Sequence, residues 1–244
     1  MTVAFLSAGD TAFSVELGST IERATNARVI ALNTALGEAI AAGRLAGVVE
    51  TVPSFRSVMV HYDPLATSRA ELEGEIRSLL ADDRPAIPKG RGWRIPVCYA
   101  PELAPDLGEV AASVGATPDR VVALHAGGAY FVYMMGFMPG FGYLGDLPEA
   151  LALPRRKEPR VRVPGGSVAI AGKLTGVYPW ESPGGWHLIG RTPVALFDLR
   201  RRAPALLAPG DRVRFAPIER AAFEAMATSI AAGEFDLGAL VDAA

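Results

Sequence analysis

Cysteine, histidine and lysine are scarce in this sequence of 244 residues. The one cysteine, Cys98, has no second cysteine for a disulfide within the chain, so nothing indicates an oxidising compartment. The three histidines, His61, His125 and His187, do not show the spacing of metal ligands. We therefore expect neither a disulfide framework nor a metal site.

The sequence also lacks an excess of either charge and any long apolar run. Its 24 basic and 26 acidic residues give a formal charge of −2, which excludes the basic footprint of a nucleic-acid-binding protein. No apolar run approaches the roughly 18 residues of a membrane span, and no basic and apolar signal peptide is visible. We expect a cytoplasmic protein that binds neither nucleic acid nor membrane.

Short motifs that would assign a chemistry are missing as well. Residues 167–174 nearly match a phosphate-binding loop, but Ser167 replaces its first glycine and Leu174 replaces its final serine or threonine. Residues 181–184 lack the first glycine of a nucleophile elbow, and Pro183 has no N–H to donate to an oxyanion. The chain shows no nucleotide-binding loop and no clear nucleophile.

A packed core is expected, because half of the residues are hydrophobic and 20% are charged. The first part of the chain alternates strands and helices, which is typical of an α+β domain. Gly9 and Asp10 predict a hairpin, and the apolar spacing predicts helices from Ser19 or Thr20 to Ala42 and from Thr67 or Ser68 onward. The expected strands cover residues 3–7, 12–17, 48–52 and 57–62.

The second part of the chain contains many short β-type runs between Gly and Pro turns, which indicates a barrel or sandwich. Thr117 and Pro118 mark the start of a helix that ends near residue 125, after a first helix over 106–114. We predict an α+β domain over 1–88 and a β-barrel domain with a C-terminal helix over 89–244. The expected strands of this second domain cover 92–99, 130–135, 167–171, 186–190, 194–199 and 212–215, with a final helix over 219–230.

Glycine and proline are concentrated in one block. The 58 residues from Gly136 to Pro193 contain 11 Gly and 8 Pro, or 33%, against 14% in the rest of the chain. Aromatic, hydroxyl and arginine residues lie between these turns. Rigid loops of this kind offer aromatic walls, backbone N–H groups and fixed guanidinium groups, which suit a small anionic or amide-bearing ligand.

The same block resembles the family of the 5-oxoprolinase B subunit, whose members are also named allophanate hydrolase subunit 1 or the kinase inhibitor KipI. The resemblance lies in the phrases GFMPGFGYL, PRRKEPRVRVPGGSVAIAG, TGVYP and SPGGW-x-x-IGRTP. It implies a ferredoxin-like N-terminal domain and a cyclophilin-like β-barrel. It also implies an ATP-dependent complex with an A and a C subunit, with or without magnesium, that opens 5-oxo-L-proline to L-glutamate. Leu174 stands where the family usually has Gln.

The resemblance and the residue types together give the candidate site residues. His125 and Arg160 are the catalytic candidates, since an imidazole can transfer protons and a guanidinium can stabilise an anion. Five basic residues against one acid in 155–162 would repel one another unless an anion or a carboxylate lay nearby. The substrate-binding candidates are Phe137, Pro139, Phe141, Tyr143, Arg155, Ser167, Lys173, Thr175, Tyr178, Ser182 and Trp186.

Each candidate also has a structural explanation, such as a core histidine, a solvated loop or a barrel aromatic. Two other functions stay open at this stage: a regulatory protein that inhibits a sensor histidine kinase, and a component of a urea or allophanate hydrolase or carboxylase. The sequence does not fix where ATP binds, the stoichiometry of the complex, or the effect of Leu174.

Overall fold

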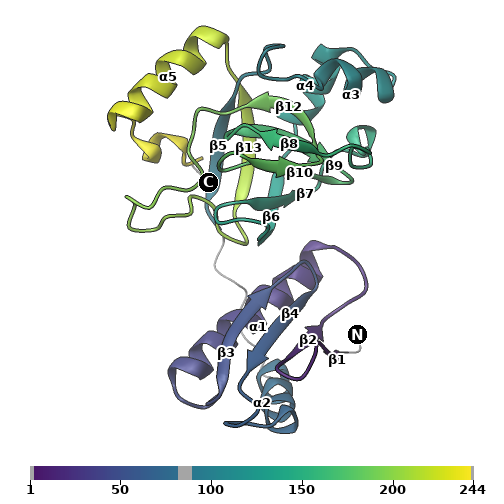
Figure 1. The fold of residues 1–244 in the computed structure, drawn as a ribbon, viewed down its shortest axis with the longest axis vertical. Helices are drawn as coiled ribbons and strands as arrows, with labels where there is room; N and C mark the ends of the chain where they lie inside the picture. The colour runs from purple at the N-terminus through teal and green to yellow at the C-terminus, as the bar shows by residue number, and fades with distance from the viewer. Residues whose placement is uncertain (1–2, 82–89, 243–244) are drawn as a thin grey trace. The chain divides into compact units, whose positions relative to one another are not determined.

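The structure, a computed structural model, describes residues 3–81 and 90–242 (Figure 1). The chain divides into two compact units, 1–89 and 90–244. The expected boundary between residues 88 and 89 lies outside the described residues. The predicted α+β class is confirmed, because a small antiparallel sheet with helices is followed by a nearly closed, barrel-like sheet.

The first unit is a four-stranded antiparallel sheet in the order β1-β2-β4-β3, with two helices. Its four strands were all expected. Helix α1 begins at Arg23, later than the predicted Ser19 or Thr20, and Glu22 is its N-cap residue. The elements are β1 (Ala4–Ser7), β2 (Ala12–Glu16), α1 (Arg23–Ala41), β3 (Val48–Pro53), β4 (Ser57–Tyr62) and α2 (Arg69–Ala81).

One hydrophobic core joins this sheet to both helices, which therefore cover the same face. In the register of β2 and β4, Phe13 lies opposite Val60 and Val15 opposite Val58, and all four side chains are fully buried. Strands β2 and β3 are separated by β4, so β2-α1-β3 is a split βαβ unit. Its inward-facing β-branched and aromatic residues explain why a strand forms at each expected place.

The second unit is a seven-stranded sheet in the order β12-β9-β10-β7-β6-β13-β5. Its edge strands meet where the N–H groups of Cys98 and Arg191 donate to each other's carbonyl oxygens, at 2.8 and 2.9 Å. This pair nearly closes the barrel. The strands are β5 (Gly92–Val97), β6 (Tyr130–Met135), β7 (Gly142–Gly145), β9 (Ser167–Ala171), β10 (Leu174–Val177), β12 (His187–Arg191) and β13 (Arg212–Pro217), beside a separate pair, β8 (Arg160–Val163) and β11 (Ser182–Gly184).

The strand predicted over 194–199 is wrong. Val194 and Leu196 are buried in the barrel core, and this burial, rather than a strand, explains the apolar pattern. The backbone there makes an isolated bridge from Phe197 to Ala205. Strands β7, β8, β10 and β11 were not expected, because each has only three or four residues and most contain glycine or proline.

The helices of the second unit are α3 (Leu107–Ser113), α4 (Pro118–Ala126) and α5 (Arg220–Ala232), with 3-10 turns at Glu149–Leu151 and Leu237–Leu240. Figure 1 shows α3 and α4 together and α5 apart from them. Thr117 caps α4 as predicted, since its Oγ1 accepts from the N–H of Arg120 at 3.2 Å. None of the helices in the described ranges has the length and apolarity needed to cross a membrane.

The contact between β5 and β12 leads to a stability prediction. A Cβ atom on Gly190 would lie 2.7 Å from Val97 Cγ1 and 3.2 Å from the Cys98 carbonyl oxygen, so Gly190→Ala must push the edge strands apart. We expect a loss of about 1–3 kcal/mol in the free energy of unfolding. Urea denaturation followed by tryptophan fluorescence measures it, because all three tryptophans belong to the second unit.

The matched control is Gly108→Ala in α3, where a Cβ would meet no atom within 4 Å. This variant is expected to be unchanged or more stable by about 0.5–1 kcal/mol, because alanine favours a helix. Equal destabilisation of both variants would contradict the close contact at Gly190.

Candidate functional site

Aromatic side chains from three segments of the second unit surround a cavity of about 270 Å³, called here the aromatic cavity. Its rings pack edge to face, and Phe141 contacts Tyr178 and Trp186 with centroids 5.4 and 5.6 Å apart. The turn at Pro183–Gly185 and the loop residue Pro159 complete the wall. The lining aromatic residues are Phe137, Phe141, Tyr143, Tyr178 and Trp186.

Among the described residues that line the aromatic cavity, Arg155 is the charged one. It makes no ion pair with a carboxylate of the described residues, so its guanidinium is available to an anion. Burial raises the pKa of Tyr143 and of Tyr178, although Arg155 opposes the rise at both. Both phenols therefore stay protonated at neutral pH and can donate hydrogen bonds to a ligand.

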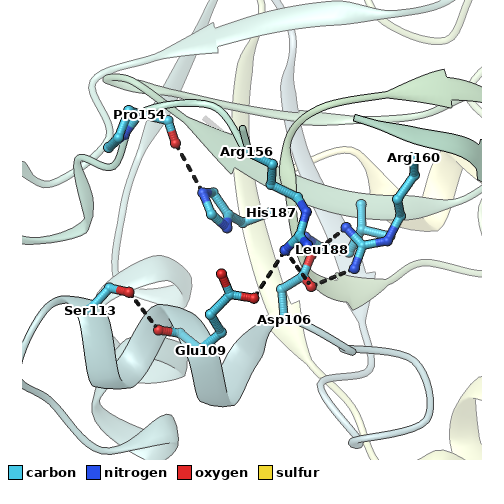
Figure 2. Close-up of polar contacts among 8 residues, drawn as sticks. All are labelled: Asp106, Glu109, Ser113, Pro154, Arg156, Arg160, His187 and Leu188. Carbon is cyan, nitrogen blue, oxygen red and sulfur yellow. Dashed lines mark hydrogen bonds and ion pairs between the residues drawn. The ribbon is translucent and has the colours of Figure 1, made fainter. Parts of the chain in front are cut away.

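The loop that carries Arg155 is fixed by a buried carboxylate, Asp106, whose side chain is 3% exposed (Figure 2). Asp106 accepts from both terminal nitrogens of Arg160, from Nη1 of Arg156 at 3.1 Å and from the N–H of Leu188 at 2.7 Å. Arg156 Nη1 also donates to Glu109 at 3.0 Å. A carboxylate with this many donors is strongly held, because bidentate and charge-assisted hydrogen bonds are short and directional.

These contacts separate the arginines that are paired with a carboxylate from Arg155. Arg156 and Arg160 are paired with Asp106, and Arg162 is paired with Glu181 on the surface. Arg155 lacks such a pair within the described ranges and faces the aromatic cavity. The predicted catalytic role of Arg160 stays a prediction: its guanidinium positions the loop, and its charge lowers the pKa of Tyr178 as one of several influences.

His125, the other catalytic candidate, is fully buried in the barrel. Its Nε2 lies 2.9 Å from Thr175 Oγ1, which donates to the Ala169 carbonyl oxygen at 3.0 Å, so Nε2 must be the N–H donor. Its Nδ1 then accepts from the hydroxyl of Tyr99 at 2.8 Å. The ring stacks on Phe215, and burial lowers the pKa of His125 to about 3. The geometry gives His125 a bridging place in the core, with no surface exposed to a ligand.

Six of the predicted substrate-binding residues line the aromatic cavity: Phe137, Phe141, Tyr143, Arg155, Tyr178 and Trp186. The other five do not. Pro139 is exposed, Ser167 and Thr175 are buried in β9 and β10, and Lys173 is exposed and paired with Glu149 at 2.8 Å. The hydroxyl of Ser182 donates to the carbonyl oxygen of Pro183 at 3.2 Å. Their ligand contacts stay predictions that this geometry does not support.

Phe137 has an unusual backbone at the mouth of the aromatic cavity. Its φ is 66°, in the left-handed region that a bulky side chain rarely adopts, and its side chain is 60% exposed. Its ring meets Phe141 edge to face at 5.6 Å. Exposed strain at a cavity mouth costs free energy that the fold must offset elsewhere, and such strain is concentrated at ligand sites.

A second cavity of about 390 Å³, called here the polar cavity, shares Arg155 with the aromatic cavity. Its wall contains Arg156, Glu109 and His187, and Figure 2 shows these three side chains close together. His187 Nε2 donates to the carbonyl oxygen of Pro154 at 2.9 Å. No group of three or more His, Cys, Asp or Glu residues in the described ranges could hold a metal ion.

Asp106 and His187 were missed as site residues. The signal for Asp106 was indirect: the basic excess over 155–162 called for a carboxylate, but the acid lies about fifty positions earlier in the chain. His187 follows Trp186 at the start of β12, and its sequence position says nothing of a cavity.

Comparison with known proteins confirms the resemblance seen in the sequence. The family model described as carboxyltransferase domain, subdomain C and D, matches residues 3–207. A protein of Bacillus subtilis (strain 168), named as the B subunit of 5-oxoprolinase, is 37% identical, covering 89% of this chain and 93% of its own length. Its namesake in Escherichia coli O157:H7 is 42% identical, covering 86% and 93%.

Two solved structures are also similar. The crystal structure of TTHA0988 has a TM-score of 0.74 and 40% identity over 85% of this chain, and this chain spans only 39% of that one. The K. lactis urea amidolyase has a TM-score of 0.76 over 98% of this chain and 16% of its own, at 19% identity. That second likeness concerns the fold alone.

The ion pairs of Asp106 lead to a prediction for Asp106→Asn. The substitution keeps an acceptor for Leu188 but leaves Arg160 without a countercharge and Arg156 with the exposed Glu109 alone, so the free energy of unfolding should fall by about 3 kcal/mol. Urea denaturation measures the loss. Glu181→Gln, which breaks the exposed pair with Arg162, is the control and should leave the midpoint unchanged. Similar behaviour of the two variants would contradict the central place of Asp106.

Burial of His125 predicts a pH dependence of stability. Because the folded pKa is about 3 and the ordinary value is 6.5, unfolding takes up a proton between these two pH values. The stabilising contribution is full above pH 6.5 and falls by up to about 1.4 kcal/mol per pH unit below it. Denaturation between pH 4 and 8 should show a shallower decline for His125→Gln than for the unchanged chain. An imidazole signal of His125 that titrates near pH 6.5 in folded protein would contradict the neutral ring.

Proposed function

The chain belongs to the carboxyltransferase domain family, subdomains C and D, and from its relatives we propose that it serves as the B subunit of a 5-oxoprolinase. The proposed complex opens the lactam of 5-oxo-L-proline to L-glutamate with hydrolysis of ATP. The Bacillus subtilis and Escherichia coli relatives that carry this name cover 89% and 86% of the chain at 37% and 42% identity. The single structural observation that supports the proposal is the aromatic cavity with Arg155 at its wall.

The aromatic cavity suits 5-oxoproline in shape and charge. The substrate is a small flat ring that carries one carboxylate, one amide N–H and one carbonyl oxygen. Arg155 can pair with the carboxylate in a bidentate manner, and the rings of Phe141 and Trp186 can contact the faces of the lactam. The hydroxyls of Tyr143 and Tyr178 can donate to the carbonyl oxygen, because burial keeps both phenols protonated.

Opening of an unstrained lactam needs activation, because an amide nitrogen is a poor leaving group. Phosphorylation of the amide oxygen by ATP would weaken the C–N bond, and nearby N–H and O–H donors would stabilise the negative charge that develops. In this chain the side-chain donors that line the aromatic cavity include Arg155, Tyr143 and Tyr178. They bind and orient the lactam. We assign the transfer of the phosphoryl group to the complex.

Partner subunits are part of the proposal. The relatives are each named as a B subunit, which implies further subunits, and we propose the A and C subunits of 5-oxoprolinase as the partners. The sequence contains neither a phosphate-binding loop nor a clear nucleophile, so we expect the reaction site to be completed by another chain. The likeness to urea amidolyase concerns the fold alone, and no described feature favours a urea derivative or a kinase as the target.

A reconstituted assay tests the proposal. The purified chain alone should be inactive, whereas its mixture with the A and C subunits should hydrolyse ATP only when 5-oxoproline is present. Urea and allophanate serve as comparison substrates. No 5-oxoproline-dependent hydrolysis in the full mixture, or a preference for a urea derivative, would overturn the proposal.

Arg155→Ala in this mixture should lower kcat/KM for 5-oxoproline by roughly 10- to 100-fold, because one charge-assisted pair with the carboxylate is lost. The control is Arg162→Ala, which removes a guanidinium from the same loop region but from an exposed ion pair with Glu181. Its kcat/KM should be unchanged. Equal losses in the two variants would show that net charge, and not contact with the carboxylate, is responsible.

A further inference from the structure

Two side chains that line the polar cavity each carry a buried nitrogen atom that no other described group satisfies. Arg156 Nε and His187 Nδ1 have no hydrogen-bond partner among the described residues, and both side chains line this cavity. A buried polar atom without a partner costs about 1–3 kcal/mol, and native folds seldom retain one without a use. Two such atoms, on two side chains of one cavity wall, point to a ligand that completes their hydrogen bonds.

His187 is held in one orientation. Its side chain is buried, with 8% exposed, and its Nε2 must carry a proton, because the carbonyl oxygen of Pro154 can only accept. Nδ1 is then either a bare acceptor or, if the ring takes up a proton, a second donor. A ligand at Nδ1 must therefore offer an O–H group to the neutral ring or an anionic oxygen to the charged one.

Arg156 is fixed in the same way from the other side. Its Nη1 donates to Asp106 and Glu109 at 3.1 and 3.0 Å (Figure 2), and its buried Nε–H has no partner among the described residues. Its backbone N–H is also engaged, with the carbonyl oxygen of Gly185 at 2.8 Å. The guanidinium is positioned before any ligand arrives, so little conformational entropy would be lost on binding.

The remaining charges of the wall favour an anion that has several oxygen atoms. Arg155 and Lys157 are exposed cations at the wall, and of the two carboxylates there, Glu109 is already paired with Arg156. A phosphate group is tetrahedral, accepts from guanidinium and ammonium groups at once, and near neutral pH can carry one O–H. That O–H can meet His187 Nδ1 or the second carboxylate, Glu158. A carboxylate ligand is planar and, when ionised, offers no donor.

We propose that the polar cavity binds a phosphate group, held by Arg156 Nε, His187 Nδ1 and Arg155, beside the aromatic cavity. Arg155 lines both cavities, so it would contact the phosphate and the neighbouring ligand together. The source is either the terminal phosphate of ATP or inorganic phosphate. The choice of ATP as the source rests on the proposed function. The phosphate site itself does not, since phosphate binding needs no 5-oxoproline and no other subunit.

Titration calorimetry of the full chain with inorganic phosphate, ATP and ADP tests the proposal. Binding of ATP that is much tighter than that of ADP identifies the terminal phosphate as the source, and binding of inorganic phosphate alone identifies the free ion. Either result supports the site. Absence of binding for all three ligands overturns it.

Two conservative variants locate the binding. His187→Gln keeps a donor for the carbonyl oxygen of Pro154 but lacks Nδ1, and Arg156→Lys keeps a charge beside Asp106 but lacks the Nε–H. Each should weaken phosphate binding by about tenfold or more, as expected for one charge-assisted hydrogen bond. Arg214→Lys, at an exposed ion pair with Asp242 in β13, is the matched control and should bind as the unchanged chain does. Equal affinity in all the chains overturns the site.

A spectroscopic measurement on the unchanged chain removes any dependence on how the variants fold. With ¹⁵N-labelled histidine, added phosphate should move the Nδ1 resonance of His187 while its Nε2 resonance stays that of a hydrogen-bonded N–H. An Nδ1 resonance unaffected at saturating phosphate overturns the assignment. Phosphate binding without 5-oxoproline-dependent ATP hydrolysis would overturn the proposed function alone. Such ATP hydrolysis without phosphate binding to this chain would overturn this site alone.

Discussion

The buried carboxylate of Asp106 is the interaction on which the candidate site depends. It ties together three parts of the second unit that are far apart in sequence: the start of α3, the loop with Arg156 and Arg160, and the N–H of Leu188 in β12. Removing a carboxylate from water is costly, and only several charge-assisted hydrogen bonds offset that cost. The loop is therefore held in one place by electrostatics rather than by a hydrophobic core of its own.

The position of this loop decides how the remaining charges act. Asp106, Glu109 and Glu181 form ion pairs with Arg156, Arg160 and Arg162, which reduces the repulsion among the positive charges of this region. Arg155 is left to pair with a ligand. Arg155 then lies at the walls of both cavities. The aromatic cavity offers ring faces and neutral phenols, whereas the polar cavity offers fixed donors. Two neighbouring sites of different chemistry thus arise from one loop.

Many elements of the fold could be predicted from local patterns. The helix cap at Thr117, the capping pair in which Ser68 and Glu71 exchange hydrogen bonds, and the strands of the first unit depend on neighbouring residues, which the sequence displays. Strand prediction failed where buried apolar residues do not belong to a strand, and where a strand has no regular apolar pattern. Val194 and Leu196 are as buried as strand residues but pair only locally, and β10 is too short and glycine-containing to give a periodic signal.

The sequence by itself determined the family, the α+β class and the block of glycines, prolines and aromatic residues, because these follow from composition and order along the chain. Six of the eleven predicted binding residues line the aromatic cavity, and all six lie within the block, between residues 137 and 186. Only the tertiary structure decided that His125 is a neutral core residue and that Arg155, rather than Arg160, lacks a carboxylate partner among the described residues. The reason is physical: burial and ion pairing depend on partners such as Asp106 and Thr175, which lie about fifty residues away in the chain.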